Sequence, residues 1–335
     1  MYEQFYGFRE KPFSMTPDPA FLYLGTKHST GLSMLRYGLM NRAGITVLTG
    51  DIGAGKTTLL RHLLNESEAD LVIGLISNTH ESFGNLMQWV AVAFDLGTDS
   101  DSKPVLYERF ASYLIEQYAA GKRTVLIVDE AQNLDDAALE ELRLLTNINA
   151  DKDQLLQLVL VGQPELRDKL RSPKLVQFVQ RVAVDFHLAP LGPEETHHYI
   201  NHRIEVAGGK PGLFGPVACR FIHYQCGGVP RLINSVCDTA LVYGFAGQET
   251  EISAELVFDM VIERITGGLF GAGHIRFDGL KADTEQQMYR KAMRRARRRA
   301  ATFLRRAHAE MEPEETQEPQ AAADRDEAEP NKQRN

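Results

Sequence analysis

Short apolar runs alternate with helix-period segments along the first part of the chain. An apolar run of four to eight residues predicts a strand, and apolar residues that recur every three or four positions predict a helix. The predicted strands are 45–49, 71–77, 124–129, 157–162 and 182–188. The predicted helices are 27–42, 55–65, 82–95, 104–119 and 136–148, with short helices in 164–180. This alternation is typical of a parallel sheet with helices on both faces.

After Pro190 the strand pattern stops and the helical pattern continues. Four helices are predicted, at 193–207, 214–226, 230–245 and 253–265. The sequence therefore predicts an α/β domain at 43–190 and a small all-α domain at 191–266. Residues 1–42 precede both domains, as an aromatic segment punctuated by prolines and then a helix, and we expect them to pack on the core.

Charge is strongly segregated near the end of the chain. Residues 267–281 are Gly-rich and are predicted to be a linker. Residues 282–309 are predicted to form a basic amphipathic helix, since 290–306 holds nine Lys and Arg and no acid. Residues 310–335 hold nine acids against three bases, and we expect this tail to be disordered.

The basic helix leaves three interpretations open. The whole chain carries a net charge of −8, so an anionic partner should meet residues 290–306 rather than the acidic body. The helix can bind an anionic membrane surface or a nucleic acid, or it can be a solvated helix packed on the helical domain. Because the acidic tail lies next to this helix in the sequence, the tail can also fold back on the helix and block its binding surface, which would be a form of autoinhibition.

Targeting features and cysteines narrow the location of the protein. The chain has no run of 18 apolar residues, and its first residues lack the pattern of a signal peptide. The three cysteines, Cys219, Cys226 and Cys237, show no CxxC spacing and are expected to be small buried residues. We therefore expect a cytoplasmic protein, with peripheral attachment to the inner membrane if the basic helix binds lipid.

A phosphate-binding loop is predicted between the first strand and the next helix. The segment GDIGAGKT matches the pattern GxxxxGK[ST] in the strand–loop–helix context that this pattern requires. Its backbone N–H groups and the helix N-terminus can surround phosphate oxygens, while the lysine reaches the β- and γ-phosphates. The predicted nucleotide-binding residues are Gly50, Asp51, Ile52, Gly53, Ala54, Gly55, Lys56, Thr57 and Thr58.

Two carboxylates follow the apolar strand 124–129, at Asp129 and Glu130. Acids at the end of a buried strand are costly unless they meet a cation, so we expect Asp129 and the Thr57 hydroxyl to hold Mg²⁺. Glu130 would orient the attacking water. Gln163, after the next predicted strand, is a candidate for contact with the γ-phosphate and this water.

Arginines can stabilise the charge that develops on a transferred phosphoryl group. Arg181 lies just before the last predicted strand and is a candidate for a neighbouring subunit's site. Arg231 opens a helix of the second domain, in GGVPR, and is a candidate for its own site. Arg203 is a weaker candidate.

Taken together, these motifs resemble those of AAA+ ATPases. The set comprises GDIGAGKT, VLIVDEAQ, VGQPEL, the QR before the last strand, and GGVPRLIN. The opening FYGFREKPFSMTPDPAFLYLGTKH is similar to the general secretion pathway protein A (ExeA-like) group, which includes ATPases of pilus biogenesis and of exopolysaccharide and exosortase loci. The resemblance covers about residues 1–265.

The resemblance implies a P-loop NTPase domain, a helical lid and an ATP·Mg²⁺ site between them. It implies a homo-oligomer, such as a ring, in which Arg181 acts in trans, and it places residues near Leu24–His28 beside the adenine. The longer secretion proteins of the group carry a transmembrane helix and a peptidoglycan-binding domain, neither of which is present here, and this favours its shorter, cytoplasmic members. Gln163 also departs from the Asn or Thr of many AAA+ proteins.

Three functions are consistent with these motifs. The first is an ATPase that drives or regulates assembly of a secretion, pilus or polysaccharide-export system through a protein partner. The second is a DNA-binding regulator that resembles transposition target-selection ATPases. The third is a scaffold that binds ATP and scarcely hydrolyses it, and the presence of Glu130 argues against it.

Overall fold

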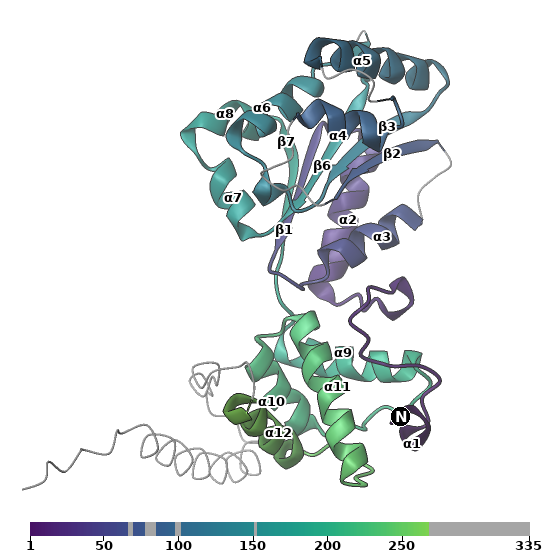
Figure 1. Ribbon diagram of the computed structural model, residues 1–335, viewed down its shortest axis with the longest axis vertical. Helices are drawn as coiled ribbons and strands as arrows, with labels where there is room; N and C mark the ends of the chain where they lie inside the picture. The colour runs from purple at the N-terminus through teal and green to yellow at the C-terminus, as the bar shows by residue number, and fades with distance from the viewer. Residues whose placement is uncertain (66–69, 78–84, 98–101, 151–152, 268–335) are drawn as a thin grey trace, which may run out of the picture. The chain divides into compact units, whose positions relative to one another are not determined.

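Five parallel strands form the central sheet of the protein (Figure 1). The computed structural model describes residues 1–65, 70–77, 85–97, 102–150 and 153–267. Across the sheet the strand order is β2-β3-β6-β1-β7. The strands are β1 (Ile45–Gly50), β2 (Leu71–Ile76), β3 (Arg123–Val128), β6 (Leu156–Gly162) and β7 (Val182–Leu188). The predicted α/β fold class is therefore confirmed.

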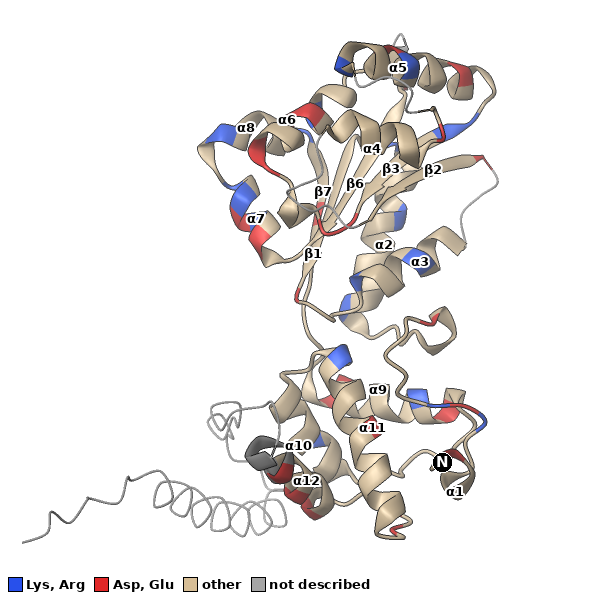
Figure 2. Ribbon diagram, in the orientation of Figure 1, with Lys and Arg blue, Asp and Glu red and all other residues tan. Residues whose placement is uncertain are grey.

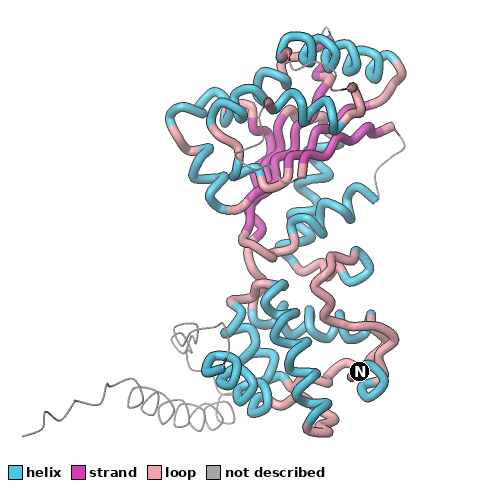
Figure 3. Tube along the Cα trace, in the orientation of Figure 1, coloured by secondary structure: helices cyan, strands magenta, loops and turns pink. Residues whose placement is uncertain are grey.

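All five strands run in one direction, so their carboxyl ends lie at one edge of the sheet. In the register, Thr49 of β1 is level with Gly162 of β6, and Val128 of β3 is level with Leu160 of β6. Figure 3 shows these strands side by side. In open α/β sheets this edge is the usual place for ligands. The topology therefore brings together the loops after β1, β3 and β6.

Helices cover both faces of the sheet (Figure 1). Successive strand residues point to opposite faces, so Val125 and Ile127 join one core while Leu126 and Val128 join the other. One face is packed by α2 (Thr26–Met40) and α3 (Lys56–Asn65). Helices on the other face are α4 (Leu86–Ala93), α5 (Lys103–Ala119), α6 (Asp136–Leu145), α7 (Pro164–Leu170) and α8 (Val176–Val179).

Several short elements were not predicted from the sequence. They are the 3-10 turn η2 (Ala131–Asn133) and the antiparallel pair β4 (Asn149–Ala150) and β5 (Asp153–Gln154). The 3-10 turn η3 (Pro173–Leu175) lies within the short helices predicted at 164–180. Elements of two or three residues are too short to show a hydrophobic period. Of these, η2 matters most for the site because it follows Glu130 directly.

The second part of the described chain is entirely helical. It comprises α9 (Pro193–Val206), α10 (Pro216–Cys226), α11 (Pro230–Ala246) and α12 (Ala254–Gly267). Three of these helices begin with proline, which suits the first helical position. Within the residues described, no helix is long and apolar enough to cross a membrane. The predicted linker, basic helix and acidic tail at 268–335 lie outside the described residues.

The N-terminal segment makes its aromatic contacts with this helical part rather than with the sheet. It contains α1 (Glu3–Tyr6) and η1 (Pro19–Phe21). Phe5 packs edge-on against Phe245 at 5.5 Å between ring centroids, and Phe13 against Phe214 at 5.8 Å. The segment then leads into α2, which packs on β7. Residues 1–25 therefore connect the two parts of the fold.

Arg203 anchors this segment from α9. The side chain is buried, and its Nε donates a 2.6 Å hydrogen bond to the Pro12 carbonyl. A second guanidinium nitrogen donates to the Tyr199 hydroxyl at 3.0 Å, and the Phe21 ring centroid lies 4.8 Å from the guanidinium carbon. This arginine therefore holds the N-terminal segment on the helical domain.

We expect Arg203→Met to destabilise the protein by about 2–4 kcal/mol, because two buried acceptors lose a charged donor. The free energy of unfolding would be measured by urea titration. The exposed Arg171→Met is the matched control, since its ion pair to Asp168 is a surface pair, and the expected change is below about 0.5 kcal/mol. Equal losses in the two variants would contradict this role for Arg203.

Candidate nucleotide site

The loop between β1 and α3 has the conformation of a phosphate cradle. Gly53 and Gly55 adopt φ angles of +80° and +99°, which side-chain-bearing residues rarely adopt. A Cβ atom on Gly50 would lie 2.7 Å from the Leu188 carbonyl of β7, so glycine is also required there. The loop then opens α3 at Lys56, whose N-terminus favours anions.

Lys56 folds back into this loop. Its side chain is buried, and Nζ donates to the carbonyls of Gly50 at 2.7 Å and Asp51 at 3.0 Å. Burial lowers the pKa of the Lys56 ammonium, while the Glu130 and Asp129 carboxylates favour its charged form. A buried ammonium among loop carbonyls is well placed to receive phosphate oxygens.

Asp129 and Thr57 meet across the edge of the sheet. The Thr57 hydroxyl donates to Asp129 Oδ2 at 3.1 Å, and the backbone N–H of Glu130 donates to Asp129 Oδ1 at 2.9 Å. A carboxylate and a hydroxyl that are this close to the phosphate loop are oxygen ligands of the kind Mg²⁺ uses with phosphates. The donor set therefore fits the predicted magnesium site.

Glu130 adopts a left-handed backbone conformation, with φ of +53°, which is uncommon for a residue with a side chain. Its Oε2 accepts hydrogen bonds from Gln132 Nε2 at 2.6 Å and Gln163 Nε2 at 3.0 Å. Burial alone would raise the pKa of Glu130, but the two amides and the Lys56 charge hold it below its ordinary value. The carboxylate is therefore ionised and oriented at neutral pH.

A cavity of about 100 Å³ lies beside the phosphate loop. Its lining includes Gly53, Gly55 and Thr58 of the loop, together with Tyr23 and His28 from the N-terminal part. The helical domain contributes Tyr199, Arg203, Asn234 and Arg231. The cavity is smaller than the roughly 300–1,000 Å³ of typical ligand sites.

Arg231 connects the helical domain directly to the phosphate loop. Its backbone N–H donates to the Gly53 carbonyl at 3.2 Å, and a Cβ on Gly53 would lie only 2.4 Å from the Arg231 Cβ. His28 contacts the same loop from α2, with Nε2 3.0 Å from the Ala54 carbonyl. The loop is therefore enclosed by elements from both parts of the fold.

Comparison with known proteins agrees with this geometry. Residues 39–170 match the family model described as "AAA domain". The chain is 42% identical over 247 residues to general secretion pathway protein A of Aeromonas hydrophila, a match that covers 73% of this chain and 45% of that protein. The chain belongs to the AAA+ family. It spans about half the length of this relative.

Solved structures show the same AAA+ fold. The Aeropyrum pernix ORC2 protein (ADPNP-ADP complexes) aligns with a TM-score of 0.55 and 15% identity, covering 76% of this chain and 72% of that chain. The Aeropyrum pernix ORC1 protein in complex with DNA aligns with a TM-score of 0.55 and 18% identity, covering 77% and 70%. At these identities the likeness extends to the fold alone.

Arg181 lies far from the phosphate loop of the same chain. It precedes Val182, which is level with Ile45 at the start of β1, whereas the loop follows Gly50 at the end of that strand. At about 3.3 Å per residue the two positions are roughly 17 Å apart along the strands. Arg181 is exposed, and it donates to the Thr146 hydroxyl at 3.3 Å. The structure therefore does not bring Arg181 to the phosphate loop of its own chain.

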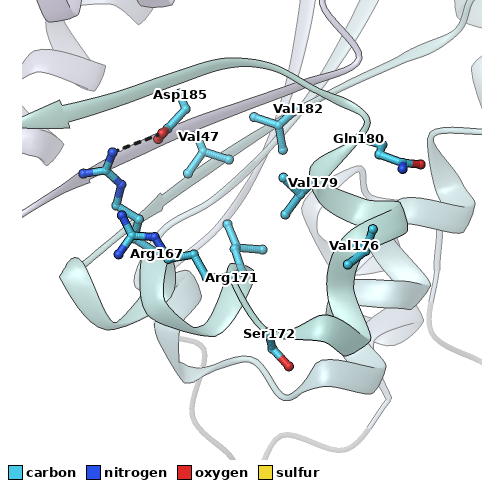
Figure 4. A pocket seen from close by; sticks show the side chains of 10 residues that line it. Val47, Arg167, Arg171, Ser172, Val176, Val179, Gln180, Val182 and Asp185 are labelled. Atoms are coloured by element: carbon cyan, nitrogen blue, oxygen red, sulfur yellow. Dashed lines mark ion pairs between the residues drawn. The ribbon is translucent and has the colours of Figure 1, made fainter.

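A second cavity of about 450 Å³ flanks Arg181 (Figure 4). It includes Gln180 and Val182, the two neighbours of Arg181 in sequence, and lies between β7, α7 and α8. Val176 and Val179 of α8 are half-exposed at its side. Asp185 and Arg167 form an ion pair of 3.5 Å at its edge. This cavity contains none of the residues predicted to bind nucleotide.

Other residues considered from the sequence have structural surroundings. The three cysteines are buried, and burial raises the pKa of the Cys219 thiol to about 12. In the described parts of the AAA+ chain, no group of three His, Cys, Asp or Glu residues is arranged to hold a metal. Sequence reasoning assigned no role to Gln132, Asn234 and Tyr199, although the first two end the quoted segments VLIVDEAQ and GGVPRLIN.

Proposed function

We propose that the protein hydrolyses ATP to ADP and phosphate with the aid of Mg²⁺. The observation that supports this most strongly is the meeting of Lys56, Thr57, Asp129 and Glu130 at one edge of the sheet. An NTPase fold alone would allow binding without turnover. A partly buried, ionised Glu130 beside the phosphate loop provides the group that turnover requires.

Each residue of the site has a separate role in the proposed hydrolysis. Residues 50–58 cradle the phosphates, and Lys56 neutralises charge on the β- and γ-phosphates. Thr57 and Asp129 would hold Mg²⁺, which supplies further neutralisation when bound. Glu130 orients a water for in-line attack, and Gln163 contacts that water and the γ-phosphate. Arg231 reports the state of the nucleotide to the lid, and Tyr23 and His28 flank the base.

Phosphate release by the purified protein tests this proposal. We expect release from ATP that depends on Mg²⁺ and stops with a chelator. The scaffold interpretation would be favoured instead if the folded protein binds ATP but releases no phosphate, even with DNA or anionic liposomes added.

In the cell, we propose that hydrolysis drives or regulates assembly of a secretion, pilus or polysaccharide-export system. The support is the similarity to general secretion pathway protein A over 73% of this chain. The proposal places the protein in the cytoplasm, where ATP is available, or at the inner membrane surface. Its partner is then a protein of the export or assembly apparatus.

A DNA-binding regulator is the second candidate, and the nine basic residues in 290–306 favour it. To separate the two candidates, the ATPase rate is measured with the protein alone, with DNA and with anionic liposomes. Each measurement is repeated on a chain that ends at residue 280. DNA stimulation that falls steeply with salt and is lost on truncation would favour the regulator. Liposome stimulation, or no stimulation by either, would favour the secretion-type function.

We further propose that the protein acts as a homo-oligomer in which Arg181 completes a neighbour's site. We expect Arg181→Ala to lower the ATPase rate at least tenfold, because a missing arginine leaves transition-state charge uncompensated. Glu130→Gln subunits carry an intact Arg181. Mixing the two variants should therefore restore part of the ATPase rate. In a mixed oligomer, an Arg181→Ala subunit keeps its own Glu130 and receives Arg181 from a Glu130→Gln neighbour. No recovery in mixed oligomers would exclude action in trans.

A further inference from the structure

The amide of Gln132 is held at both ends. Its Oε1 accepts the backbone N–H of Gln163 at 3.0 Å, and its Nε2 donates to Glu130 Oε2 at 2.6 Å. The first bond comes from the backbone where β6 ends, so it does not depend on the conformation of the Gln163 side chain. Because one amide has one acceptor end and one donor end, these two bonds determine its orientation.

The backbone of Gln132 is anchored as well. Lys169 of α7 donates from Nζ to the Gln132 carbonyl at 2.7 Å, and it also contacts the Leu134 carbonyl. In addition, a Cβ on Gly162 would lie 3.0 Å from Gln132 Oε1, so a side chain at position 162 would crowd the amide. Figure 2 shows that α7 carries charges of both signs. Among them, Lys169 makes the hydrogen bond to η2 described above.

Gln163 is held differently. Its side chain has one described hydrogen bond, from Nε2 to Glu130 Oε2 at 3.0 Å. If Gln163 turns toward a γ-phosphate, as the proposed function requires, it leaves the carboxylate. The Gln132 bond remains, because none of its anchors involves the Gln163 side chain.

We propose that Gln132 is a positioning residue for hydrolysis, which keeps the Glu130 carboxylate oriented while Gln163 serves the phosphate. This inference rests on the proposed ATPase function. In that step the water oxygen bonds to the γ-phosphorus as the bond to the β,γ-bridging oxygen breaks. ADP leaves with the electron pair, and the water proton passes to Glu130 and then to phosphate. Gln132 itself exchanges no proton.

The test compares three variants with the wild-type full-length chain. Gln132→Met keeps the side-chain length and removes both hydrogen bonds. Gln132→Glu keeps an acceptor for the Gln163 N–H and removes the donor to Glu130. Gln117→Ala, on α5, is the control in the same domain. For each protein, kcat, KM, the Kd for ATP and the melting temperature are measured.

We expect both Gln132 variants to lower kcat roughly tenfold to hundredfold, because one hydrogen bond to a charged group is lost. KM and Kd should change less than about twofold, which a loss of loop structure would not produce. The fall in kcat should be larger for Gln132→Glu, which places a like charge beside Glu130.

Wild-type kcat in both variants would overturn the role of Gln132 and leave the ATPase proposal intact. A fall in kcat together with an equal rise in Kd would also overturn it, because the effect would then be on nucleotide binding. If the wild-type protein shows no hydrolysis with any of the partners tested above, the proposed function fails and this inference fails with it.

Discussion

Glu130→Gln is expected to stop turnover and to leave ATP bound. Glutamine has the same shape, so the contacts of η2 and the phosphate loop survive, but it cannot take a proton from water. We expect kcat to fall about 100-fold or more, while the Kd for ATP stays within a few-fold of wild type. Timed ATPase assays measure kcat, and titration with a fluorescent ATP analogue measures Kd.

The control for this variant is Glu116→Gln, an exposed acid on α5. Its kcat should equal that of the wild-type protein. Turnover at the wild-type rate in Glu130→Gln would show that another group activates the water. A parallel loss of ATP binding would show instead that Glu130 supports the loop rather than the chemistry.

Lys56→Ala is expected to remove ATP binding itself. The buried ammonium now satisfies loop carbonyls and would neutralise phosphate charge in the complex. A hydrogen bond to a charged group contributes about 1.5–3 kcal/mol, and Lys56 would make more than one to phosphate, so we expect Kd to rise at least about 100-fold. Calorimetric titration with Mg²⁺ and a slowly hydrolysed ATP analogue measures this change.

Lys122→Ala is the matched control, because Lys122 is exposed on the turn before β3. It should bind the analogue as the wild-type protein does. If Lys56→Ala still binds with wild-type affinity, the loop after β1 is not the phosphate site. Melting temperatures of all variants establish that each protein remains folded.

Most helices and strands of the fold could be predicted because their apolar periods are regular. For example, the strand predicted at 182–188 is β7 (Val182–Leu188), and the helix predicted at 104–119 is α5 (Lys103–Ala119). The order of the strands could not be predicted, because β6 pairs with strands that lie far from it in the sequence. Leu156 of β6 is level with Thr124 of β3, and Leu158 of β6 is level with Ile45 of β1. Pairing over such distances leaves no local pattern.

The chemistry at the carboxyl ends of the strands could also be predicted, because each residue there belongs to a motif. Asp129 and Thr57 were expected together, and they lie in hydrogen-bond contact. The roles assigned to these residues stay predictions until activity is measured. The contacts of Gln132 and Arg203 could not be found from sequence, because they depend on which distant backbone groups face these side chains.

The central claim is that Glu130 acts on water at a Mg²⁺-dependent ATP site. A single-turnover experiment tests it most directly, with full-length protein in excess over labelled ATP and with the Glu130→Gln variant in parallel. We predict that the wild-type protein converts the bound ATP to ADP and phosphate, while the variant holds it unchanged over the same time. Identical conversion by both proteins, or retention of intact ATP by both even with DNA or liposomes present, would contradict the account.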